Sequence, residues 1–152
     1  MNYNNNYKNN NQDRDRRSKP QPVPPLPFTE LTNDNYVSLA EKVIEKLNEN
    51  KSILTTSQLR NILSLNSEIF NTVVIDTNSE LSDSVCAKLQ YLKVRMVYDS
   101  GRDNKNKVKD FIENSHLIEH IDKIGKSKEK YILFSRYMEA LVAYRKFIGH
   151  DR

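Results

Sequence analysis

The stretch SKEKYILFSRYMEALVAYRKFIG, from Ser127 to Gly149, decides the fold class of this chain. It contains no proline, and its large apolar side chains recur at intervals of three or four residues, which places them along one stripe of an α-helix. The stripe consists of Tyr131, Phe134, Met138, Leu141 and Val142, with Tyr137, Tyr144 and Ile148 beside it. The stretch therefore predicts an amphipathic helix that packs this stripe against other helices.

Segments upstream repeat this periodicity, and no proline interrupts them after residue 27. Because proline removes a backbone donor and clashes with the preceding turn, its absence permits uninterrupted helices. These further predicted helices cover about 34–49, 55–75, 80–100 and 103–125. For the last of them two readings stay open, a continuous helix or a break near Asn114–Ser115. We predict an all-α fold, a compact bundle of about five helices.

Local signals mark where these helices begin and end. Thr55 and Gln58 have the spacing of a capping box, in which each side chain satisfies a backbone amide of the first turn. Gly101 suits the left-handed position after a helix, and Gly125 and Gly149 also follow predicted helix ends. The β-branched run 72–75 resembles a strand, but no second strand is available to pair with it. We therefore expect a helix to end there.

The N-terminal part differs in composition from the rest. Seven of the first twelve residues are Asn, and all five prolines lie between Pro20 and Pro27. Such sequences bury too little apolar surface to offset the entropy of ordering. We predict a disordered Asn/Pro-rich tail over 1–32, followed by a helical domain over 33–152. The tail has three readings: a loose tail, which we favour, a ligand for a proline-recognition domain, or a basic arm.

Charge and composition exclude several classes of protein. The net charge is +4, too small an excess to indicate nucleic-acid binding alone. A single cysteine, Cys86, leaves no internal disulfide and no cysteine-built zinc site. No apolar run approaches the roughly 20 residues that span a membrane. The N-terminus lacks the apolar region of a secretory signal. We expect a cytoplasmic protein that does not contact a membrane.

The sequence offers one catalytic motif, HLIEH over His116–His120, which matches the inverted-zincin pattern. Two histidines four residues apart on a helix can bind zinc, with Glu119 as general base. The site needs a third ligand, and the chain is too small for a metalloprotease domain. We favour an exposed amphipathic turn. There is no Gly-rich phosphate loop either, so we expect no cofactor and no enzymatic activity.

Basic residues cluster in two segments that also carry aromatic side chains. Residues 88–112 hold seven basic and three acidic side chains, and residues 126–152 repeat that balance. Lysine and arginine on helices suit phosphate groups as charge-assisted hydrogen-bond donors. The other reading is that these charges only solvate the surface of a bundle. From the residues alone, both readings stay open.

Four stretches resemble a known family: ILTTSQLRNIL (53–63), LQYLKVRMVYDSGRD (89–103), VKDFIE (108–113) and YMEALVAYRKFIG (137–149). They are similar to the small subunit of type III-A CRISPR effector complexes, the Csm type, over roughly 33–150. The resemblance implies a five-helix, non-catalytic subunit for antiviral defence. Its expected partners are crRNA and target RNA, the repeated backbone subunit, the large signalling subunit and other copies of itself.

The resemblance also suggests which residues contact RNA backbones. Our predicted phosphate contacts are Arg60, Lys93, Arg95, Arg102, Arg145 and Lys146. Second choices are Lys51, Lys88, Lys105 and Arg136. For Tyr91 and Tyr144 we favour packing in the core over contact with RNA. The alternative function is a purely structural adaptor that bridges neighbouring subunits and touches RNA only incidentally.

Overall fold

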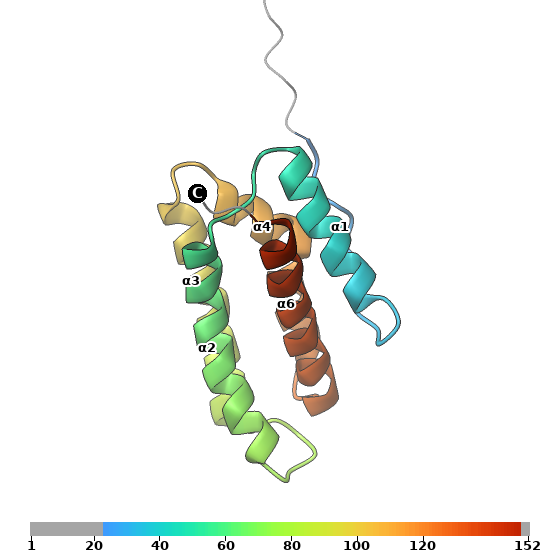
Figure 1. Ribbon diagram of the computed structural model, residues 1–152. Coiled ribbons are helices and arrows are strands. Elements are labelled where there is room, and N and C mark those ends of the chain that lie inside the picture. Colours follow the sequence, from blue (N-terminus) through green and yellow to red (C-terminus); the bar gives the residue numbers. More distant parts are fainter. Residues whose placement is uncertain (1–22, 150–152) are drawn as a thin grey trace, which may run out of the picture.

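A computed structural model describes residues 23–149 (Figure 1). Within them the chain forms six α-helices and no strand, the one isolated bridge joining Glu80 to Ser127. The helices are α1 (Tyr36–Glu49), α2 (Thr56–Ile75), α3 (Asp83–Arg102), α4 (Lys107–Ser115), α5 (Leu117–Ile124) and α6 (Lys128–Ile148). The all-α prediction is confirmed, and over 103–125 the structure has the broken form of the two readings, α4 followed by α5.

The helix starts follow the predicted caps. The Thr55 hydroxyl accepts from the Gln58 amide at 3.1 Å, and the Gln58 side chain accepts from the Thr55 amide at 2.9 Å. This completes the capping box at the start of α2. Ser127 caps α6 in a similar way by accepting from the Lys130 amide. The β-branched run 72–75 is helical, as expected.

The helix ends agree with the sequence only in part. Gly125 takes a left-handed φ of 55° after α5, as its type predicts. The prediction for Gly101 is wrong, because α3 runs through it to Arg102 and the Asp103 amide still bonds to the Asp99 carbonyl. The break between α4 and α5 falls at His116, whose φ is 54°. It directly follows Asn114–Ser115, near which a break was one of the two open readings.

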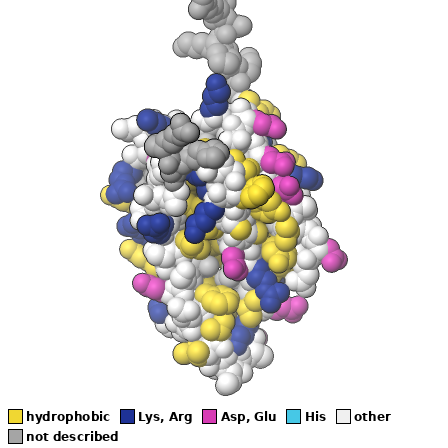
Figure 2. Space-filling model, in the orientation of Figure 1, with side chains coloured by type: hydrophobic (Ala, Val, Ile, Leu, Met, Phe, Trp, Pro, Cys, Tyr) yellow, Lys and Arg dark blue, Asp and Glu magenta, His cyan; other side chains and the backbone are white. Residues whose placement is uncertain are grey.

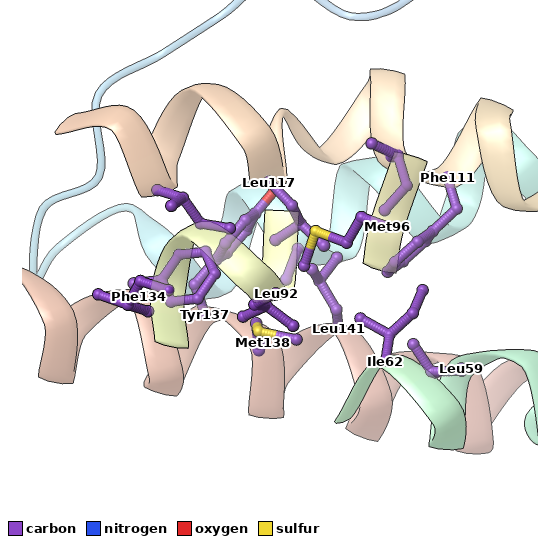
Figure 3. Close-up of a cluster of buried hydrophobic side chains, with 14 of the residues drawn as sticks. Leu59, Ile62, Leu92, Met96, Phe111, Leu117, Phe134, Tyr137, Met138 and Leu141 are labelled. Atoms are coloured by element: carbon purple, nitrogen blue, oxygen red, sulfur yellow. The ribbon is translucent and has the colours of Figure 1, made fainter. Parts of the chain in front are cut away.

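α6 is the central helix of the bundle, in contact with α1, α2 and α5 (Figure 1). Figure 3 shows side chains from several helices converging on one apolar core, among them Phe134, Met138 and Leu141 of α6. The buried hydroxyls of this helix have partners: Tyr131 donates to the Asn66 side chain at 2.9 Å and Tyr137 to the Ser115 carbonyl at 2.9 Å. These bonds fix α6 against α2 and against the α4–α5 break.

The prediction of a disordered tail over 1–32 needs a correction from residue 23 onward. The Leu26 amide donates to the Asn114 side chain at 3.0 Å, and the Leu26 carbonyl lies 2.5 Å from Nε2 of His116. The Phe28 ring packs on His116 and His120, with centroid distances of 5.7 and 4.9 Å. Residues 23–32 are thus a strap over the bundle, which the proline-rich composition concealed. The rest of the predicted tail, 1–22, lies outside the described residues.

No helix between residues 23 and 149 combines the length and the apolar character that crossing a membrane requires.

Candidate nucleic-acid interface

Four helix ends meet at one end of the bundle. α2 begins there, α3 ends and α4 begins, and α6 ends beside the loop that precedes α2 (Figure 1). The end of α6 contacts this loop through a hydrogen bond of 2.7 Å from Nε of Arg145 to the Leu54 carbonyl. We call this region the basic end, and define it by five exposed or half-exposed cations. They are Arg60, Arg102, Lys105, Lys107 and Lys146.

A polar cleft of about 410 Å³ opens at the basic end. Arg102, Lys105 and Lys107 line one side, and the first turns of α2 contribute Gln58 and Asn61. Arg60 lies on that same turn of α2 and is exposed. Between residues 23 and 149 no ion pair forms with Arg60 or with any of the three cleft cations. Asp99 and Asp103 also line the cleft and the Asp103 carboxylate attracts Lys107, but no carboxylate of the described chain lies within ion-pair distance of these four cations.

Asp103 organises the junction between α3 and α4, where two of these lysines lie. Its carboxylate accepts from the Lys105 amide at 3.1 Å and from the Val108 amide at 2.9 Å. The bond from the Val108 amide is the main reason why the pKa of Asp103 is lowered from its usual value. Asp103 therefore stays ionised at neutral pH and holds the backbone between α3 and α4, so that Lys105 projects from a fixed loop and Lys107 from the first turn of α4.

Tyr98 lies on the exposed face of α3 between two arginines. The guanidinium carbons of Arg95 and Arg102 lie 5.5 and 5.8 Å from the centre of its ring. Arg95 also forms a long ion pair of 3.7 Å with Asp99, a residue of which only 7% is exposed. For Arg102, by contrast, the described chain provides no hydrogen bond or ion pair to the guanidinium. Its donors remain open to a ligand.

Lys93 has a structural partner. Its ammonium lies 2.6 Å from the Asp122 carboxylate, which joins α3 to α5. Its side chain is 31% exposed. Lys93 stays a predicted phosphate contact, but a phosphate has to compete with Asp122 for it.

The prediction for Arg145 requires a correction. Only 3% of this residue is exposed, and its Nε donates to the Leu54 carbonyl. The reason is periodicity, because Arg145 follows Leu141 by four residues and Met138 by seven, which places it on the core stripe of α6. The sequence contained this signal. Lys146, one position further on, is exposed.

The second-choice residues and the tyrosines lie in several places. Lys88 is exposed on α3, and Lys51 is exposed in the α1–α2 turn. Arg136 lines a different cleft, near the start of α6. Tyr144 packs against the core, as expected, but Tyr91 is 54% exposed, so the expectation of core packing is wrong for it.

Basic and acidic side chains are distributed unevenly over the surface of the molecule. In Figure 2, Lys and Arg side chains gather on the upper left of the visible face, whereas most acidic side chains lie on the right, the side of α1. This helix carries Glu41, Glu45 and Glu49. At the far end of the bundle, Lys126 pairs with Asp83 at 3.6 Å and Lys128 donates to the Asp76 carbonyl.

The histidines of the HLIEH motif face the strap instead of forming an open site. His120 is 5% exposed, and its ring lies between Phe28 and Tyr137. Burial lowers its pKa to about 4, so it is neutral at pH 7. In the part of the chain that the structure describes, no group of three His, Cys, Asp or Glu side chains has the arrangement of a metal site. We expected an exposed amphipathic turn at this motif, but His120 is buried.

The sequence was compared with known proteins. The family model Csm2 Type III-A matches residues 30–151. The chain is 44% identical over 117 residues to the CRISPR system Cms protein Csm2 of Mycobacterium tuberculosis, an alignment that covers 76% of this chain and 92% of the relative. It is 43% identical over 123 residues to the protein of that name from Streptococcus thermophilus, covering 78% and 95%. This chain belongs to the Csm2 family of type III-A CRISPR systems.

Proposed function

We propose that this chain, a small subunit of a type III-A CRISPR effector complex, lines the path of the crRNA–target RNA duplex with its basic end. It takes part in antiviral defence without catalysing a reaction. Its partners in the complex are the repeated backbone subunit, the large signalling subunit and further copies of itself. Base pairing between the two RNAs supplies sequence specificity, and the protein contacts backbones.

The observation that carries this proposal is the state of the cations at the basic end. Arg60, Arg102 and Lys105 form no ion pair within residues 23–149, although the chain holds twenty acidic residues. Exposed cations that lie together repel one another, and an anionic polymer relieves this repulsion while releasing its own counterions. Helix ends and a fixed loop hold these side chains, as is typical of contacts that position a protein on a backbone.

A second candidate, the structural adaptor, rests on exposed apolar side chains away from the basic end. Val74 and Ile75, at the end of α2, are 49% and 81% exposed. Isolated apolar side chains are common on protein surfaces, so two neighbouring residues weigh less than five gathered cations. The two functions are compatible, because one end of a subunit can bind its neighbour while the other contacts RNA.

The test is a charge-reversal pair in the assembled complex. In the variant Arg102→Glu/Lys105→Glu, we expect target RNA to bind more weakly and ultraviolet crosslinks from this subunit to labelled RNA to disappear. The control with the same change in net charge is Lys126→Glu/Lys130→Glu, which reverses two exposed lysines at the far end. Crosslinking that is equal in the two variants, in complexes of normal composition, contradicts the RNA-lining role and favours the adaptor.

A further inference from the structure

The exposed face of α3 carries an aromatic site that backbone contacts leave unexplained. Tyr98 is 56% exposed, and Val94 and Val97 next to it are 60% and 58% exposed. We propose that Tyr98, with Arg95 and Arg102 beside it, forms a stacking site for an unpaired RNA base. This inference rests on the proposed function, because it names the kind of nucleotide that the α3 face holds.

The geometry around Tyr98 suits a planar ligand. Arg95 precedes it by three residues and Arg102 follows by four, which puts all three side chains on one face of the helix. Both guanidinium carbons lie within 6 Å of the ring centre, at 5.5 and 5.8 Å. A base can therefore stack on the tyrosine ring or on a guanidinium plane, because both are flat surfaces that proteins use to hold nucleobases.

The charge of this face selects an anionic partner. After Asp83 in its first turn, α3 contains one acidic residue, Asp99, and that residue is buried. The other charged side chains of α3 are basic: Arg95 and Arg102 lie beside Tyr98, Lys88 is exposed further along the helix, and Lys93 pairs with Asp122 of α5. An exposed ring among cations, with a free guanidinium one turn away, matches a nucleotide, whose base stacks while its phosphate accepts from Arg102. An apolar protein surface offers no partner for these charges.

The site distinguishes paired from unpaired nucleotides. Within a duplex both faces of each base are covered by neighbouring bases, so only a base that has left the stack can lie on a side chain. Stacking on an aromatic ring is tolerant of sequence, because every base has a π-face. The site therefore adds a preference for unpaired nucleotides to the proposed backbone contacts and adds no base specificity.

The experiment measures binding of the full-length chain to three RNAs of equal length by fluorescence anisotropy at low salt. One RNA is single-stranded, one is fully paired, and one is a single strand in which abasic residues replace the nucleosides. We expect Tyr98→Ala to weaken binding to the single strand by roughly tenfold, because base–aromatic stacking is of that order. Binding to the duplex and to the abasic strand should not change.

Three further variants separate stacking from other effects. Tyr98→Phe keeps the ring and should retain wild-type affinity, whereas Tyr98→Leu keeps an apolar side chain without a flat ring and should behave as Tyr98→Ala. The matched control is Tyr91→Ala, which removes an equally exposed tyrosine of α3 that has no guanidinium over its ring in the described chain. Circular dichroism establishes that each variant is folded.

Each outcome supports or overturns the stacking site. Equal single-strand affinity for Tyr98→Leu and Tyr98→Phe overturns it, and so does an equal loss on all three RNAs. Unchanged RNA binding with loss of association between protein subunits assigns the face to a protein partner instead. The proposed function fails separately, if the wild type binds none of the RNAs or if Arg102→Glu/Lys105→Glu leaves all three affinities unchanged.

Discussion

At the far end of the bundle, where α2 leads into α3, two lysines bind groups of the chain itself. Lys126 pairs with Asp83, and Lys128 donates to the carbonyls of Asp76 and Asn78. At the basic end, Arg102, Lys105 and Lys107 project beside a cleft without forming an ion pair in the described chain. Both ends contain lysines, so a count of charges does not separate them. Intramolecular partners separate Lys126 and Lys128 from the three cleft cations, whereas Lys130 at the far end is exposed and forms no ion pair in the described chain.

Arg145 shows the same distinction within one helix, and replacing it should have the largest effect. Arg145→Ala removes a buried side chain and leaves the Leu54 carbonyl without its donor. We expect the free energy of unfolding to fall by about 3 kcal/mol, from the lost hydrogen bond and the cavity. Lys146→Ala should change it by less than about 0.5 kcal/mol. Urea denaturation compares the two, and equal losses contradict the assignment of Arg145 to the core.

Acid should weaken the strap side of the molecule and leave the basic end charged. His120 has a pKa of about 4 in the fold, below the usual 6.5 of the unfolded chain. The unfolded state therefore binds more protons between these values, and stability should fall as the pH drops through this window. From pH 7 to pH 5 we expect a loss of about 2 kcal/mol from this group.

The control for this prediction of acid sensitivity is the variant His120→Gln, which removes the titrating ring. Urea denaturation at several pH values should show a smaller loss of stability in this variant than in the wild type between pH 7 and pH 5. If the two proteins lose stability in parallel, His120 does not titrate as its burial implies.

The capping box connects local structure to the basic end, because it fixes the first turn of α2, which carries Arg60. Thr55→Ala removes the hydroxyl that accepts from the Gln58 amide. We expect a loss of about 1 kcal/mol in the free energy of unfolding. The control is Thr77→Ala, an exposed threonine in the loop after α2. A loss no larger than that of the control means that the cap contributes nothing measurable.

The ion pair between Lys93 and Asp122 should have the smallest effect. Both side chains are partly exposed, at 31% and 51%, so solvent screens their attraction. A double-mutant cycle with Lys93→Ala and Asp122→Ala should give a coupling of about 0.5 kcal/mol in unfolding. A coupling several times larger assigns Lys93 to the structure of the bundle, and not to RNA.

The predictions from sequence were most accurate where apolar residues recur at the helical interval of three or four positions or where a capping motif is present. The stripe of α6 and the box at Thr55 predicted helices that the structure confirms. The strap needed long-range contacts that no local pattern contains. Residues 23–32 are held by Asn114 and His116, about 90 positions away. Gly101 lies inside α3, which continues to Arg102. The low helix propensity of glycine had favoured a helix end at this position.

The sequence predicted that the candidate site is basic, but it did not predict correctly which residues form it. The family resemblance suggested Arg102, with Lys105 as a second choice, and both line the cleft. Lys107 and Tyr98 were missed, because their importance comes from the cleft and from flanking arginines, which only the packed helices bring together. Arg145 was included although its spacing from Leu141 indicated the core. Contact with RNA stays a prediction for Arg102, Lys105, Lys107 and Tyr98, whereas the burial of Arg145 removes it from the proposed site.

The most direct test of the central claim, that the basic end contacts RNA phosphates, is the salt dependence of RNA binding by the assembled complex. For Arg102→Ala/Lys107→Ala, the slope of log affinity against log salt concentration should become less steep by about one for each lost contact. For the far-end control Lys126→Ala/Lys130→Ala the slope should remain that of the wild type. The same slope in all three complexes contradicts the claim.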